Sequence, residues 1–257
     1  MSIVACVKVH DGFALGADSA TTISGKDQQG KVAVLKVYHE AKKIFEFNKL
    51  PVGILTYGTG NIGKKSIQIL LRDFEAKKSI SEKSYTIKEI TEKIYSYFKK
   101  IYDEQFNGST TKPILGFYIA GYSYGCNQGE EWEFVIPDGK CKMVRPLGEN
   151  GSSWRGITMP FSRLYYGIDP RIKEELRKCK IDQSFLDKFQ AAVIYDGMPL
   201  KVAVKFVEFV LKTTIELAAF EIGPESCSEP IHSAVIDSKK GFEWLNETFI
   251  RERRASK

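Results

Sequence analysis

The stretch MSIVACVKVHDGFALGADSATT (residues 1–22) decides the fold, because it predicts two strands joined by a tight turn. Residues 3–9 are rich in β-branched side chains, Asp11 and Gly12 form a typical hairpin dipeptide, and residues 13–17 are a second apolar run. An Asp-Gly pair tolerates the positive φ angles that a two-residue hairpin turn needs. Both runs are apolar at nearly every position, so we expect this hairpin to belong to a sheet that is covered on both faces.

The rest of the chain predicts blocks of strands separated by pairs of helices. Apolar side chains at helical spacing predict helices at 61–76 and 86–101, and Thr86 and Glu89 form a capping box. Further helices are predicted at 161–166, 172–176 and 199–220, loops at 24–31 and 150–153, and strands at 43–47, 52–57, 114–121, 132–136, 142–145, 231–236 and 241–245. The long helix at 199–220 is expected to bury Val202, Phe206, Phe209, Val210, Thr213 and Leu217. This order argues against regular βαβ alternation and favours an α+β fold with antiparallel sheets between helices.

Composition and charge exclude several classes of protein. The net charge of +6 is spread along the chain, and no stripe of Lys and Arg interleaved with aromatic residues indicates nucleic-acid binding. No apolar run reaches the length of about 18 residues that a membrane span needs, and the start of the chain lacks the pattern of a signal peptide. Five scattered cysteines without a C-x-x-C pair, and three histidines far apart, indicate neither a disulfide framework nor a zinc site. We therefore expect one cytoplasmic domain over residues 1–257, with a basic tail at about 247–257 and no binding to nucleic acid or membrane.

A glycine-rich stretch, LTYGTGNIGKKS (residues 55–66), matches the spacing of a dinucleotide-binding loop at Gly58, Gly60 and Gly63. Such a loop requires a second parallel strand that ends in an acidic residue about 20 residues later. Here the predicted helix leads into another helix, and Asp73 lies within the first one. The P-loop pattern G-x-x-x-x-G-K-[ST] is not matched either, because G-K-K-S does not complete it. The stretch therefore predicts a tight turn with exposed backbone N–H groups and no nucleotide cofactor.

Both ends of the chain resemble one family. Ser2 followed by VKVHDGFALGADSATT (residues 7–22), and then AKKIFEFNKLPVGILTYGTGNIG (residues 41–63), resemble proteasome β subunits and their simpler bacterial relatives, the N-terminal-nucleophile hydrolases. Residues 198–220 and 230–245 resemble the long penultimate helix and the terminal strands of that family, whereas 124–197 match loosely. The resemblance implies a four-layer α/β/β/α sandwich and hydrolysis of peptide or amide bonds without a cofactor or metal. It also implies a homo-oligomer, as a ring or partial ring, and leaves an unfoldase partner open.

The resemblance also assigns the candidate catalytic residues. Ser2 matches the nucleophile at the mature N-terminus, and Asp18, sixteen residues later, matches a site aspartate. Lys43 matches the site lysine, and Tyr57 and Gly58 match the loop whose backbone amide binds the oxyanion.

Elementary chemistry supports these roles. A serine hydroxyl needs an adjacent base, and a free α-amine, which titrates near ~8, can supply it once Met1 is removed. A buried Lys43 would lower the pKa values of the hydroxyl and the amine, and Asp18 would pair with that ammonium. An amide at Tyr57 or Gly58 would contribute roughly 3 kcal/mol to oxyanion stabilisation.

The match is incomplete at the supporting positions. The nucleophile is Ser where proteasome subunits carry Thr, and the bulk of Tyr57 is expected to narrow the pocket. Thr158 is our candidate for the family's supporting serine, with Ser153 second. The family's late acidic–serine pair could be supplied by Glu221 or Glu225 together with Ser226 or Ser228.

Simpler roles for these residues also fit the sequence. Asp18 alone could cap a turn with Ser19, and Lys43 alone could be a solvated charge at a strand end. A non-catalytic scaffold subunit of the same fold would tolerate Met1. An amidase for a small molecule would have a closed pocket instead of a groove along a sheet edge.

Overall fold

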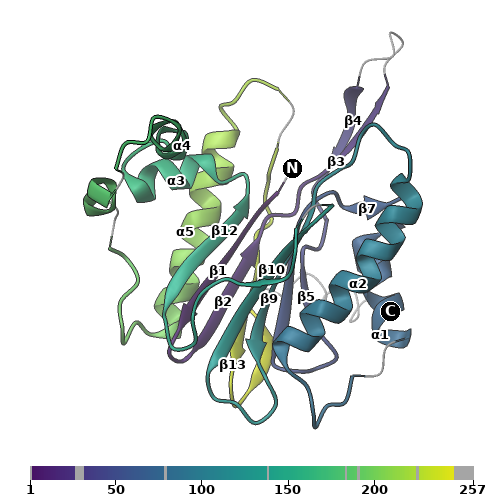
Figure 1. Ribbon diagram of the computed structural model, residues 1–257, viewed down its shortest axis with the longest axis vertical. Helices are drawn as coiled ribbons and strands as arrows, with labels where there is room; N and C mark the ends of the chain where they lie inside the picture. Colours follow the sequence, from purple (N-terminus) through teal and green to yellow (C-terminus); the bar gives the residue numbers. More distant parts are fainter. Residues whose placement is uncertain are drawn as a thin grey trace, which may run out of the picture.

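The protein has an α+β fold in which two antiparallel five-stranded sheets carry the core (Figure 1). The computed structural model describes residues 2–26, 32–77, 80–137, 139–182, 184–189, 192–223 and 226–245. The predicted α+β class with antiparallel sheets is confirmed. The predicted basic tail at 247–257, Met1, Asp138 of the predicted turn at 137–139, and Glu225 lie outside the described residues.

The first sheet is built around the predicted hairpin and has the strand order β12-β1-β2-β13-β14. Strands β1 and β2 pair from Val4↔Ala17 to Val9↔Gly12, so Asp11 and the residue before it form the turn. Gly12, at φ +150°, lies so close to the carbonyl of Ile236 that no Cβ would fit there. The strands are β1 (Ile3–Val9), β2 (Gly12–Ala17), β12 (Gly151–Gly156), β13 (His232–Asp237) and β14 (Gly241–Trp244).

The second sheet faces the first and has the order β11-β10-β9-β6-β5. Its strands are β5 (Ile44–Glu46), β6 (Val52–Gly58), β9 (Leu115–Tyr122), β10 (Gly129–Ile136) and β11 (Lys142–Met143). Alternate side chains of β1 and β2, including Cys6, Phe13 and Leu15, meet Leu55 and Tyr118 of this sheet in a buried cluster. Side chains on both faces of the hairpin are therefore buried, which explains why both runs are apolar at nearly every position.

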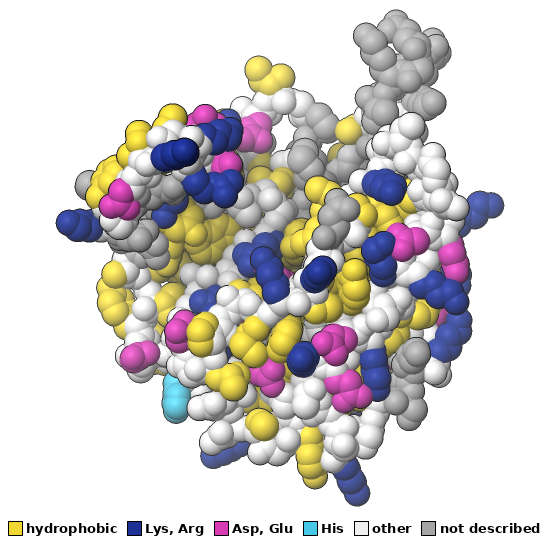
Figure 2. All heavy atoms as spheres, viewed as in Figure 1, with side chains coloured by type: hydrophobic (Ala, Val, Ile, Leu, Met, Phe, Trp, Pro, Cys, Tyr) yellow, Lys and Arg dark blue, Asp and Glu magenta, His cyan; other side chains and the backbone are white. Residues whose placement is uncertain are grey.

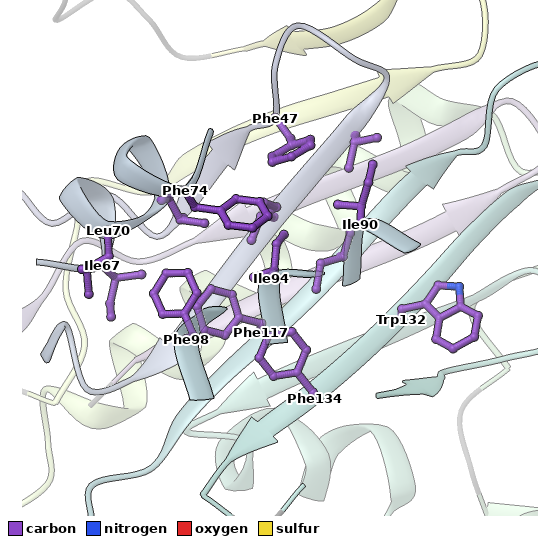
Figure 3. Close-up of a cluster of buried hydrophobic side chains, with 14 of the residues drawn as sticks. Phe47, Ile67, Leu70, Phe74, Ile90, Ile94, Phe98, Phe117, Trp132 and Phe134 are labelled. Atoms are coloured by element: carbon purple, nitrogen blue, oxygen red, sulfur yellow. The ribbon is translucent and has the colours of Figure 1, made fainter. Parts of the chain in front are cut away.

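Helices cover the outer face of each sheet. Helix α5 (Leu200–Ala218) packs on β1 and β2, while α1 (Ile67–Lys77) and α2 (Ile87–Phe106) share an apolar cluster with the second sheet. Figure 3 shows Phe74, Ile94 and Phe98 from the helices against Phe117 and Phe134 from the strands. The shorter helices are α3 (Met159–Tyr166), α4 (Pro170–Lys178) and the 3₁₀ helix η1 (Ser184–Phe189).

The start of α2 follows the predicted capping box. Thr86 has extended backbone dihedrals and its hydroxyl accepts a hydrogen bond from the N–H of Glu89, at 3.1 Å. That bond satisfies one of the donors that a helix N-terminus leaves unpaired. The buried face of α2 then holds Ile87, Ile90 and Ile94, as the helical spacing predicts.

Four predicted elements differ from the structure. Residues 61–66 form a two-stranded hairpin, β7 (Asn61–Ile62) and β8 (Lys65–Ser66), and the helix begins only at Ile67. Of the expected loop at 24–31, residues 24–26 belong to β3 (Thr21–Lys26), and residues 27–31 lie outside the described residues. Strand β3 pairs with β4 (Val32–Tyr38), and the two strands extend away from the sheets in Figure 1. The expected loop at 150–153 is the start of β12, which pairs with β1.

The fourth difference is the register of α5. The helix buries Ala203, Val207 and Leu211, whereas the predicted stripe contains Val202 and Phe209, which are 43% and 49% exposed. A Cβ on Gly16 of β2 would lie 2.3 Å from the Val207 Cγ1 atom, so α5 packs where small residues allow a close approach. The close fit of α5 to the sheet, more than the size of its apolar side chains, therefore determines which face of the helix is buried.

None of the described helices is long and apolar enough to cross a membrane. In Figure 2, basic, acidic and apolar side chains are interspersed over the visible face.

Candidate active site

A cavity of about 360 Å³ opens where the β1–β2 hairpin has its free ends. Four sequence-predicted residues line it, namely Ser2, Lys43, Tyr57 and Gly58. The other walls come from the β3–β4 hairpin, the segment before β5, the end of β6 and the first turn of α1. The structure therefore brings together residues from three separate parts of the sequence.

Lys43 and Asp18 form a buried ion pair beside this cavity. The Lys43 Nζ donates to the Asp18 Oδ1 atom at 2.6 Å, and the two side chains are 7% and 0% exposed. Burial lowers the pKa of Lys43, and the charge of Asp18 opposes that shift. A lysine in this state loses its proton more easily than a solvated one, which suits a group that tunes a neighbouring nucleophile.

Asp18 also fastens three backbone segments. Its Oδ1 atom accepts the N–H of Ile3 at 2.9 Å, and Oδ2 accepts the N–H groups of Ala20 at 3.0 Å and Ser228 at 3.4 Å. A carboxylate with four donors is held in one orientation. Asp18 therefore fixes the start of β1, and the Lys43 ammonium with it.

Ser2 is buried at the start of β1 and is held through its backbone. The Ile157 N–H donates to the Ser2 carbonyl at 2.7 Å. A Cβ on Gly156, at φ +94°, would lie 1.9 Å from that carbonyl oxygen, so only glycine allows this contact. The serine is thus positioned in the cavity wall by the end of β12.

Tyr57 and Gly58 end strand β6 in a fixed conformation. Gly58 has φ +92°, and a Cβ there would lie 2.2 Å from the Ile114 carbonyl oxygen. The Thr59 N–H donates to that same oxygen at 2.8 Å, so this N–H group is already engaged. The Tyr57 ring lies over Gly116, and burial raises its pKa to about 12. The phenol therefore stays protonated at neutral pH and forms part of the wall.

The glycine motif does not form the context of a dinucleotide-binding loop. Strand β6 pairs antiparallel with both β5 and β9, and the β7–β8 hairpin separates it from α1. A dinucleotide-binding loop joins a parallel strand directly to a helix N-terminus. Gly58 and Gly60 of this stretch line the cavity, and Gly58 ends β6 with a positive φ angle.

The two candidates for the supporting serine lie elsewhere. Thr158 precedes α3 and accepts the Ser162 N–H through its carbonyl, but it is not among the residues that line the cavity. Ser153 lies between the sheets, where its hydroxyl accepts a hydrogen bond from Arg145 at 2.6 Å. Thr158 is therefore connected to Ser2 only through its neighbour Ile157. The Ser153 hydroxyl is occupied by its hydrogen bond with Arg145.

The candidates for the late pair separate in the same way. Ser228 reaches the site, because its N–H donates to Asp18 and its carbonyl accepts the Ser19 N–H at 3.1 Å. Ser226 is buried two residues earlier, and Glu221 is exposed. The Ser228 hydroxyl lies 2.6 Å from the His39 Nδ1 atom.

Two histidines near the site were missed by sequence reasoning. His39 contacts Ser228, and His232 pairs with Ala17 in the neighbouring strand. Burial lowers the pKa of His232, and the nearby charges of Lys42 and Lys43 add to this shift. Strand register alone could have placed His232 beside the end of β2. Because His39 and His232 lie far apart in the sequence, no local pattern indicated that both lie near the site. Within the described residues, no group of three or more His, Cys, Asp or Glu side chains could hold a metal ion.

The fold is similar to that of solved Anbu structures. The Anbu complex from Pseudomonas aeruginosa, described as a helical assembly, has a TM-score of 0.61 and 15% identity, covering 100% of this chain and 92% of that one. Anbu from Yersinia bercovieri has a TM-score of 0.53 and 12% identity, covering 99% and 92%. A mutant Anbu from Hyphomicrobium sp. has a TM-score of 0.58 and 12% identity, covering 100% and 93%. No protein-family model and no curated protein matches the chain.

These findings correct the family drawn from the sequence. The similar solved structures are Anbu proteins, described as an ancestral β-subunit, so the resemblance to proteasome β subunits named the wrong type of subunit. At 12–15% identity the likeness shows a shared fold. The chain therefore has the fold of Anbu.

Proposed function

We propose that this protein is an amide hydrolase whose nucleophile is the Ser2 hydroxyl, exposed as the chain terminus by removal of Met1. The observation that carries the proposal is the buried Lys43–Asp18 pair, at 2.6 Å, beside a cavity that Ser2 also lines. A buried ammonium paired with one carboxylate, next to a hydroxyl in a cavity wall, is an arrangement that suits nucleophilic catalysis.

The proposed reaction proceeds through a seryl ester. The α-amine of Ser2 takes the hydroxyl proton as the oxygen attacks the amide carbon. The Lys43 ammonium stabilises the developing negative charge on the nucleophile, and Asp18 holds that ammonium in place. The backbone amide at Tyr57 or Gly58 binds the oxyanion, the amine product leaves with the proton, and water then hydrolyses the ester.

Intact-mass analysis of natively expressed protein is the first test. A mass that retains Met1 would exclude the mechanism, because the α-nitrogen of Ser2 would then be an amide without basicity. With Met1 absent, a hydroxyl-directed covalent inhibitor should add one equivalent to Ser2. Labelling should disappear in Ser2→Ala and Lys43→Ala and persist in Lys42→Ala, the exposed neighbour. A non-catalytic scaffold would show no labelling in any of these proteins.

The architecture and assembly belong to the same proposal. We interpret residues 1–257 as a single domain with a four-layer α/β/β/α sandwich, in which the two sheets lie between α5 on one side and α1 and α2 on the other. A homo-oligomer is supported by the helical assembly of the Anbu complex from Pseudomonas aeruginosa. It is also supported by the exposed apolar side chains of Phe209 and Leu217 on α5. A peptide or other amide substrate and a cytoplasmic location stay predictions.

A further inference from the structure

A second cavity, of about 180 Å³, lies at the turn end of the β1–β2 hairpin. It shares no lining residue with the cavity that contains Ser2. Lys8, near the end of β1, lines it together with Phe13, Tyr122, Asn127 and Gln128. Because Ser2 and Lys8 are six residues apart along an extended strand, the two cavities are separated by about 20 Å.

The ammonium group of Lys8 is buried without a hydrogen-bond partner among the described residues. The residue is 5% exposed, and its Nζ atom neither donates to a protein atom nor reaches the surface. Burial lowers the pKa of Lys8, while the charge of Glu131 opposes the shift. An unpaired ammonium in such a place carries a desolvation penalty that a bound anion would relieve.

The Glu131 carboxylate, whose charge acts on Lys8, is already engaged by other donors. Glu131 accepts hydrogen bonds from the Tyr118 hydroxyl at 2.6 Å and the Cys6 thiol at 3.5 Å, and it pairs with Arg145. Lys8 and Arg145 therefore face one buried carboxylate with two positive charges. The charge of Glu130 also acts on Lys8, so two cations and two carboxylates meet in this part of the space between the sheets.

The other acidic groups of this end do not line the cavity. Glu130 accepts hydrogen bonds from Ser123 and Trp132. Asp237 accepts the backbone N–H groups of Lys239 and Lys240, and Asp11 lies in the exposed turn. The charged or titratable side chains among the lining residues are Lys8, His10 and Tyr122.

The cavity combines the unpartnered Lys8 side chain with an apolar wall. The Phe13 and Tyr122 rings meet edge to face with their centroids 5.5 Å apart, and Val9 adjoins them. Amide side chains such as Asn127 and Gln128 offer further donors. We propose that this cavity binds a small organic carboxylate: the Lys8 ammonium, which is buried in this structure, turns toward the carboxylate oxygens, and the apolar tail lies against Phe13 and Tyr122.

Titration calorimetry with propionate tests the proposal, using propionamide as the neutral ligand of the same shape and inorganic phosphate as an anion without an apolar tail. Propionate should bind once per chain and propionamide should not. Lys8→Met should weaken propionate binding at least about tenfold, the loss expected for one charge-assisted hydrogen bond. Lys240→Met, on the exposed turn before β14, should leave it unchanged.

A second variant guards against misfolding of the core substitution. Gln128→Glu places a carboxylate at the exposed rim of the cavity and should weaken propionate binding without disturbing the core. Ser2→Ala should keep full affinity, which separates this site from the proposed hydrolase. The proposal is overturned if propionate does not bind, if Lys8→Met and Gln128→Glu both bind it normally, or if phosphate binds as tightly as propionate.

Discussion

A lysine is buried at each end of the β1–β2 hairpin, and the two lysines differ in whether the ammonium group has a hydrogen-bond partner. At the open end, Lys43 donates to Asp18, which also accepts three backbone N–H groups. At the turn end, Lys8 has no hydrogen-bond partner among the described residues, although Glu131 lies near it. Burial lowers the pKa of both lysines.

The difference separates two uses of a buried charge. A partnered ammonium is held in one position and can act on a neighbouring group, as proposed for Ser2. An unpartnered ammonium keeps its donors available for an anion, as proposed for the cavity beside Phe13. Burial alone would not distinguish these cases, because both lysines are almost fully covered. The presence or absence of a carboxylate partner makes the difference.

The strongest test of this comparison is Lys43→Met. It should lower the free energy of unfolding by about 3–5 kcal/mol, because the buried Asp18 carboxylate loses its cation. Urea unfolding measures the change, with the exposed Lys42→Met as the control. The double variant Asp18→Asn/Lys43→Met should recover part of the loss. A cost under about 1 kcal/mol for the single variant would contradict the importance of the pair.

Matched glycines at the two cavities give the next largest effect. Gly58 and Gly148 have similar φ angles, +92° and +84°, but a Cβ at Gly58 would strike the Ile114 carbonyl whereas Gly148 has open space. Gly148→Ala should cost about 1–2 kcal/mol for its backbone conformation alone. Gly58→Ala should cost more and should also abolish labelling of Ser2. Equal losses in thermal unfolding would mean that the close approach at Gly58 is unimportant.

Lys8→Met should have the opposite sign from Lys43→Met. Replacing the unpartnered ammonium with an apolar side chain of similar length should stabilise the protein by about 1 kcal/mol, measured without added carboxylate. Glu131 keeps Arg145 as its partner, so no buried charge is left alone. Destabilisation by this variant would show that Lys8 contributes a favourable interaction with Glu131.

The smallest expected effect is on pH dependence. Because burial lowers the pKa of Lys8, the folded state binds fewer protons than the unfolded state between that lowered value and the ordinary value of about 10.5. The stability of the wild type should therefore rise with pH in this window relative to Lys8→Met. The advantage of the variant should shrink as pH approaches 10.5. A difference that is independent of pH would contradict a lowered pKa.

Local chemistry predicted part of this molecule well. The Asp-Gly turn gave the β1–β2 hairpin, and the Thr86 capping box gave the start of α2, because both depend on neighbouring residues alone. The buried face of α5 was predicted wrongly, since it depends on the room that Gly16 leaves on the sheet. The end of β3 was missed because the polar run at 24–31 resembles a loop, and β4 was missed although its sequence, VAVLKVY, is typical of a strand.

The same division holds for the candidate site. The family resemblance brought out Ser2, Asp18, Lys43 and Gly58, and the structure places them around one cavity or its ion pair. The contact of Ser228 with Asp18 joins residues 210 positions apart, so no local pattern could single it out among several candidates. Lys8 lies on the inward side of a strand by simple alternation, but only the three-dimensional structure shows that no partner meets it among the described residues.

The reach of Asp18 across the chain has a consequence for synthesis. Its carboxylate connects the first strand to Ser228, which the ribosome adds 210 residues later. A nascent chain that stops before Ser228 lacks one of the four donors that orient this carboxylate, and it also lacks β13 beside β2. The proposed nucleophile is therefore made early but is supported late. Under the proposed mechanism, truncated or unfinished chains would carry the serine without the complete surroundings of Asp18 and would not hydrolyse amides.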